Sequence, residues 1–184
     1  GGLPMIKAMS APYTNIRFMP TGGINADNLN SYLDFPKVLA CGGSWMVKPE
    51  LINSGDFEGI KNLTRQAVKQ MLGFEVAHVG INQPDEANAM GAADRFASFF
   101  GFEKKAGNSS VFVGTGIEIM KGAGLGANGH IAIRTNYINR AMAYPSRLGA
   151  EFDMDTAKYD EKGRLKAVYL KEEIGGFAVH LVQK

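Results

Sequence analysis

The sequence IRFMPTGG at residues 16–23 joins a short apolar run to a proline and glycine turn, and VLACGGSW at residues 38–45 repeats this arrangement. Short apolar runs followed by turn residues are typical of buried strands. Helices are predicted from Leu3 to about Ser10, from Asn25 to about Asp34, and from about Asp56 to Met71, where apolar residues recur at helical spacing. The resulting order of strand, turn, helix, strand, turn and helix predicts a parallel α/β fold.

The two glycine turns have the properties of a phosphate-binding cup. Glycine lets backbone N–H groups approach an oxyanion closely, and a following helix adds about half a positive charge at its N-terminus. Two neighbouring turns of this kind commonly hold phosphate at the last two strands of an eight-stranded α/β barrel. The alternative is that glycine ends these strands for steric reasons alone.

The pattern changes after Gly73, and a new order of elements then occurs twice. A strand is predicted over residues 74–82, a helix over about 85–100 and one or two strands over 110–120; the second copy has a strand over 130–135, a helix over about 137–144 and strands from about 151 to 182. Pro145 predicts a short or kinked second helix. Residues 160–163, DEKG, predict a hairpin turn. This is an internal repeat, weak in identity but clear in layout.

All three histidines of the chain lie at corresponding strand positions of this repeat. Side chains alternate between the two faces of a strand, so the aliphatic neighbours of each histidine should face the helices. His78, His130 and His180 would then share the opposite face with Glu118, which closes the first copy. There they can converge on a divalent cation such as Zn²⁺, Ni²⁺, Mn²⁺ or Fe²⁺. The alternative is that they are ordinary polar residues on a solvated face.

Two motifs, PTGGI at residues 20–24 and GGSW at residues 42–45, occur together and in order. With Gly2, Asn28 and the segment IKA at residues 6–8, they closely resemble the C-terminal third of the KDPG/KHG aldolase family over roughly residues 1–72. The resemblance implies part of a TIM (β/α)8 barrel and a class I aldolase that needs no cofactor. Its reaction would be retro-aldol cleavage of a phosphorylated keto sugar acid, or of 4-hydroxy-2-oxoglutarate, to pyruvate and an aldehyde. The residues implied to bind substrate are Thr21, beside the keto-acid pocket, and Gly22, Gly23, Gly43 and Ser44, around the phosphate.

The same resemblance implies that the Schiff-base lysine and the glutamate base precede Gly1. The chemistry needs that lysine, because its iminium accepts the electrons left after carbon–carbon cleavage. Lys7, Lys37 and Lys48 are predicted to be solvated surface residues that do not replace it. We therefore expect a fragment of the barrel with phosphate-binding loops but no turnover, and a homo-oligomer for the full-length protein.

Paired βαβββ modules with ligands at these positions resemble the vicinal oxygen chelate superfamily, which includes glyoxalase I. The resemblance covers residues 74–184 and implies an α+β domain, bounded here at residues 73–184. It implies the metal ligands His78, Glu118, His130 and His180, with histidine in the fourth position where the glyoxalase pattern usually has glutamate. This domain is then a metal-dependent lyase, isomerase or dioxygenase, or alternatively a non-enzymatic structural domain.

Composition narrows the possible partners. The chain has 20 basic and 18 acidic residues and a net charge of +2, with no basic block of the kind that binds nucleic acid. No apolar run approaches the ~20 residues that cross a membrane. A single cysteine, Cys41, favours a reducing compartment, so we expect a cytoplasmic protein whose partner is a phosphorylated keto sugar acid.

Overall fold

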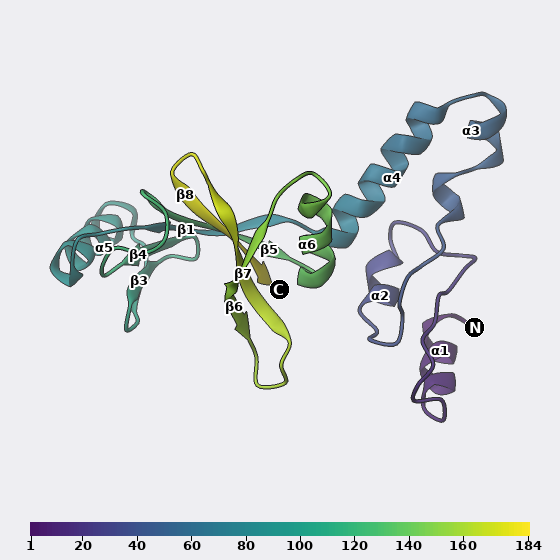
Figure 1. Cartoon of the computed structure of the whole chain (residues 1–184), viewed down its shortest axis with the longest axis horizontal. Helices are drawn as coiled ribbons and strands as arrows, with labels where there is room; N and C mark the ends of the chain where they lie inside the picture. Colours follow the sequence, from purple (N-terminus) through teal and green to yellow (C-terminus); the bar gives the residue numbers. More distant parts are fainter. The chain divides into compact units, whose positions relative to one another are not determined.

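The computed structural model describes all 184 residues, which form a mixed α/β structure (Figure 1). The chain divides into two compact units, Gly1–Met71 and Leu72–Lys184. None of its helices combines the length and the apolar character that crossing a membrane requires.

The first unit is mainly helical. Its elements are α1 (Gly2–Ser10), α2 (Leu29–Leu33), the 3₁₀ helix η1 (Ser44–Met46), α3 (Pro49–Asn53) and α4 (Phe57–Leu72). The predictions of helices near residues 3–10 and 56–71 are confirmed. Asp56 precedes α4 and accepts a hydrogen bond from the backbone N–H of Gly59 at 2.8 Å, which is how a capping residue begins a helix.

The two predicted strands of this unit are reduced to a single parallel bridge between Phe18 and Val38. Two strands without further neighbours form a ladder of marginal stability, which explains the short pairing. The helix predicted from Asn25 begins four residues later, at Leu29. Asn25 instead accepts hydrogen bonds through Oδ1 from the backbone N–H groups of Asp27 and Asn28, at 3.0 and 3.2 Å. This local turn competes with regular helix at the point where the helix was predicted to start.

The second unit contains the same sequence of elements twice. The first copy consists of β1 (Glu75–Ile81), α5 (Glu86–Phe100), β2 (Lys104–Ala106), β3 (Ser110–Val113) and β4 (Ile117–Met120). The second consists of β5 (Gly129–Thr135), α6 (Ile138–Ser146), β6 (Phe152–Tyr159), β7 (Leu165–Ile174) and β8 (Phe177–Gln183). The repeat, the short second helix and the turn after β6 are confirmed. Strand β2 was not predicted, because its three residues are all exposed and carry no apolar pattern.

All eight strands form one sheet in the order β2-β3-β4-β1-β5-β8-β7-β6. In each copy the first and last strands pair in parallel, β1 with β4 and β5 with β8, and the antiparallel pair of β1 and β5 joins the copies. Helix α5 packs against β3 and β4, and α6 packs against β7 and β8. The core beneath α5 is built from Ala89, Ala93, Val111, Val113 and Ile119. The two helices thereby cover one face of the sheet at β3, β4, β7 and β8. Glu118, which lies between Ile117 and Ile119 on β4, points to the opposite face.

Candidate metal centre

The four predicted ligands come from the four central strands of the sheet. Glu118 lies on β4, His78 on β1, His130 on β5 and His180 on β8. The registers place Gly80 beside both Glu118 and His130, and place Ala132 beside both His78 and His180. Paired residues share a face of the sheet, so all four ligand candidates share one face, as the alternation of side chains predicted.

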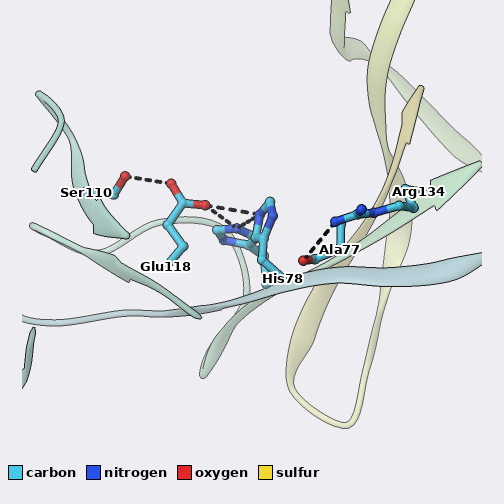
Figure 2. A network of polar contacts seen from close by, with 6 residues as sticks. Ala77, His78, Ser110, Glu118 and Arg134 are labelled. Atoms are coloured by element: carbon cyan, nitrogen blue, oxygen red, sulfur yellow. Dashed lines mark hydrogen bonds and ion pairs between the residues drawn. The ribbon is translucent and has the colours of Figure 1, made fainter. Parts of the chain in front are cut away.

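Three of these side chains form a nearly equilateral triangle of ligand atoms (Figure 2). The Nε2 atoms of His78 and His130 are 3.1 Å apart, and Glu118 Oε2 lies 3.1 Å from the first and 3.2 Å from the second. An imidazole nitrogen has one lone pair or one N–H bond, directed in the ring plane, so it does not satisfy two such neighbours by hydrogen bonding.

The size of the triangle fits a shared ion. Ligand atoms about 2.1 Å from one ion are about 3.0 Å apart at octahedral angles and about 3.4 Å apart at tetrahedral angles. The three observed separations, 3.1, 3.1 and 3.2 Å, fall between these values. Two imidazoles and one carboxylate on one side of an ion are also the ligand set of many mononuclear iron enzymes.

His180 adds a third imidazole to the group. The ligand atoms of the three histidines all lie within 4.8 Å of one another, so these residues could hold a metal ion. The His180 side chain is only 8% exposed, and both of its ring nitrogens are buried without a hydrogen-bond partner. Its ring stacks on Tyr169 with the centroids 4.4 Å apart. Burial, and then the neighbouring His130 and His78, lower the pKa of His180 to about 3, so the ring is neutral at pH 7 with a free lone pair.

Glu118 is oriented by a residue that sequence reasoning missed. Ser110, buried on β3, donates a hydrogen bond from Oγ to Glu118 Oε1 at 2.6 Å, which leaves Oε2 for the histidines. Burial alone would raise the pKa of Glu118, but hydrogen bonds from His130, His78 and Ser110 outweigh it and hold that pKa well below its usual range. The carboxylate is therefore a permanent anion facing two imidazoles. No sequence signal distinguishes Ser110 from an ordinary residue at the start of a strand.

Gly80 makes room for His130. A Cβ atom on Gly80 would lie 2.1 Å from the His130 ring, far closer than non-bonded atoms approach. The glycine is therefore required by space, since the ring crosses strand β1 where a side chain would otherwise stand. A glycine inside a predicted strand is a known signal for such an approach, and this signal could have been used.

The predicted phosphate-binding residues occupy two turns that lie side by side. The backbone N–H of Gly42 donates to the carbonyl of Pro20 at 2.9 Å, and the Phe18–Val38 bridge precedes both turns. Gly22 and Gly23 have φ angles of +74° and +68°, which favour glycine, and a Cβ atom added to either would meet no other residue within 4 Å. Of the remaining members, Thr21 and Ser44 are exposed and Gly43 is half-buried. The two turns are thus brought together, and their binding of phosphate stays a prediction.

Comparison with known proteins shows which family the first unit is similar to. Residues 1–63 match the KDPG and KHG aldolase family. The 2-dehydro-3-deoxy-phosphogluconate aldolase of Treponema pallidum is 49% identical over 69 residues, which cover 38% of this chain and 33% of that protein. The KHG/KDPG aldolase of Escherichia coli K12 is 41% identical over 69 residues, with 38% and 32% covered. The matched part of the chain therefore spans about a third of the length of these two curated aldolases.

Solved structures are similar to another part of the chain. Methylmalonyl-CoA epimerase from Mycobacterium tuberculosis matches with a TM-score of 0.42 and 15% identity, over 59% of this chain and 86% of that one. The E323L mutant of homoprotocatechuate 2,3-dioxygenase from Brevibacterium fuscum matches with a TM-score of 0.43 and 16% identity, over 59% and 32%. Both TM-scores are below 0.5. The fold of residues 72–184 is therefore defined by their own strand order.

Proposed function

We propose that residues 72–184 form a metal-dependent enzyme domain that holds one divalent ion through His78, Glu118, His130 and His180. The triangle of ligand atoms at 3.1, 3.1 and 3.2 Å is the observation that supports it. Imidazole and carboxylate ligands together suit Zn²⁺, Ni²⁺, Mn²⁺ or Fe²⁺. Together with the resemblance to vicinal oxygen chelate proteins, this makes the domain a lyase, isomerase or dioxygenase.

The chain's own residues prepare the site for an oxygen-containing substrate. An ion bound there supplies Lewis-acid polarisation of substrate oxygen atoms. Glu118 contributes a fixed negative charge that Ser110 orients, and His180 contributes a neutral nitrogen. The Phe112 ring stands edge-on to His78 with centroids 5.4 Å apart, and Tyr169 stacks on His180. These two rings pack against the ligand histidines on either side of the centre.

Elemental analysis of the purified 184-residue chain tests this function. We expect close to one equivalent of a transition metal in the unaltered protein, and a large loss in the His78→Ala and His130→Ala variants. Unchanged metal content in both variants would eliminate the site. A non-enzymatic assembly domain would instead contain no metal, and deletion of residues 73–184 would change the size of the assembly.

We also propose that residues 1–72 are the C-terminal part of a KDPG/KHG aldolase barrel. The family match and the two adjoining glycine turns support this function. Thr21, Gly22, Gly23, Gly43 and Ser44 would hold the phosphorylated end of a keto sugar acid that is cleaved to pyruvate and an aldehyde. The lysine that forms the iminium is proposed to lie outside the 184 residues, so this chain alone would bind the phosphate without cleaving the substrate.

Two measurements separate phosphate binding from turnover. Borohydride reduction in the presence of pyruvate should leave no stable mass adduct on this chain, and an adduct would show that one of its lysines forms the iminium. Inorganic phosphate should shift the NMR signals of the Gly22, Gly23 and Ser44 amides. Ser44→Ala should weaken these shifts, whereas Ser54→Ala, a matched change between α3 and α4, should not. Absence of any shift in the unaltered chain would contradict phosphate binding.

A further inference from the structure

Strand β1 contains one extra residue immediately before His78. Glu75 pairs with Arg134 and Val76 with Ile133 on β5, but the next pair is His78 with Ala132. Ala77 therefore has no opposite residue of its own, which is the arrangement of a β-bulge.

The bulge determines which face His78 occupies. Directly opposite residues of an antiparallel pair lie on the same face, so Glu75, Arg134, His78 and Ala132 share one face. Residues three apart in a regular strand lie on opposite faces, because the side-chain period is two. Without the bulge, a strand that began at the Glu75–Arg134 pair would direct His78 toward the helices, away from Glu118 and His130.

Only one strand, β5, pairs with β1 at the bulge. Pairing of β1 with β4 begins at Val79, one residue after His78, so Ala77 has only β5 beside it. The Arg134 side chain reaches from β5 to this point and donates a hydrogen bond from Nη2 to the Ala77 carbonyl at 3.3 Å (Figure 2). Arg134 is itself half-buried, and it lies on the same face as the histidines.

We propose that Arg134 is a positioning residue that holds the Ala77 bulge and thereby directs His78 into the ligand triangle. This role rests on the proposed metal function of the site. The 3.1 Å separations of the ligand atoms are needed only if these atoms bind one ion. Ligand geometry tolerates errors of only about 0.5 Å and 10–20°, and a bulge changes the direction of a side chain by more than that. Arg134 acts through the backbone of Ala77 and contacts no ligand atom of the centre.

NMR of the metal-free chain tests the positioning directly. The ring protons of His78 and His130 should give a nuclear Overhauser cross-peak, because their Nε2 atoms are 3.1 Å apart. Arg134→Met removes the donor at similar length and should abolish the cross-peak, whereas Arg134→Lys can still donate and should retain it. Lys105→Met, the same loss of charge on exposed β2, is the matched control and should also retain it. A persisting cross-peak in Arg134→Met would overturn the role of Arg134.

Cobalt binding then measures the consequence for the site. Arg134→Met should lower the Co²⁺ affinity about 10- to 100-fold, as changes behind metal ligands do, and should alter the visible spectrum of the Co²⁺-saturated protein. A merely structural residue would lower the melting temperature but leave the spectrum of the saturated site unchanged. Deletion of Ala77 removes the bulge but keeps Glu75 and His78 on one face, so Co²⁺ binding should no longer depend on Arg134. Adding Arg134→Met to this deletion should therefore lower the affinity no further, and a further loss of about 10-fold would contradict the role of the bulge.

Failure of the metal function and failure of the role of Arg134 would give different results. If the unaltered chain binds no Co²⁺, the proposed metal function is wrong, and the cross-peak between His78 and His130 still decides whether Arg134 positions the ring. If the unaltered chain binds Co²⁺ and Arg134→Met binds it equally well, the metal function stands and the positioning role is wrong.

Discussion

The two units of the chain differ in how well their candidate residues are brought together, and sequence similarity does not predict the difference. Residues 1–63 match an aldolase family, with a relative that is 49% identical over 69 residues, yet their two predicted strands share a single bridge and their candidate residues line exposed turns. Residues 72–184 lie outside that family match, yet four side chains from four strands meet at one point. A short motif can therefore indicate a family without forming a complete site. In the second unit the eight-stranded sheet brings residues that are distant in the sequence into one site.

The largest expected effect is the loss of the metal centre. Glu118→Gln keeps the shape of the side chain but removes the charge that faces both histidines, so Zn²⁺ affinity should fall by more than about 100-fold. Competition with a chromogenic chelator measures it. Glu103→Gln, before β2, is the matched control and should bind like the unaltered chain. Equal affinity of the two variants would show that Glu118 does not hold the ion.

A single methyl group at position 80 should weaken the centre and also destabilise the fold. In Gly80→Ala the new Cβ would meet the His130 ring at 2.1 Å, so the ring must move. We expect a roughly tenfold or greater loss of Zn²⁺ affinity and a destabilisation of about 1–3 kcal/mol, the usual effect of overpacking. In Gly116→Ala the added atom meets nothing within 4 Å, and this control should change neither quantity. Parallel chelator and urea titrations compare the pair.

Acid should destabilise the second unit before the first. The folded pKa of His180 is about 3 against 6.5 for a free histidine, so between these pH values the unfolded state binds the proton and the folded state does not. Unfolding free energy should therefore fall as the pH drops below 6.5, by about 2 kcal/mol at pH 5. Glu118, with its lowered pKa, adds to the loss only below about pH 4.5.

Urea unfolding of the metal-free chain at pH 7 and pH 5 checks this prediction. His180→Phe should remove most of the difference between the two pH values. The first unit contains none of the chain's three histidines and should change little over the same interval. An equal loss in both units would show that the buried imidazole is not the cause.

The smallest expected effect concerns the orientation of the carboxylate. Ser110→Ala removes the 2.6 Å hydrogen bond to Glu118 Oε1 and should lower Zn²⁺ affinity by about tenfold. Ser109→Ala, at the preceding residue, is the matched control and should leave the affinity unchanged. If both variants bind alike, Glu118 is oriented by the two histidines alone.

Much of the second unit could be predicted from the sequence. The α5 boundaries follow from Asp85, which caps the first turn by accepting from the Asn88 N–H at 2.8 Å, and from Gly101, whose φ of +68° ends the helix. The alternation of apolar and polar residues was sufficient to assign His78, Glu118, His130 and His180 to one face. These are local properties, because capping and side-chain alternation depend on residues close together in the chain.

Other features depend on which strands become neighbours. The bulge at Ala77 exists only because β1 pairs with β5 in a particular register, and the need for glycine at position 80 arises only because His130, on β5, lies opposite it. In the first unit, the same dependence leaves the strands at Phe18 and Val38 with a single bridge. In the second unit the sequence by itself determined the main helices and strands, the alternation of side chains along them and the ligand candidates. The tertiary structure decided register and mutual distance, because these follow from pairing between segments far apart in the chain.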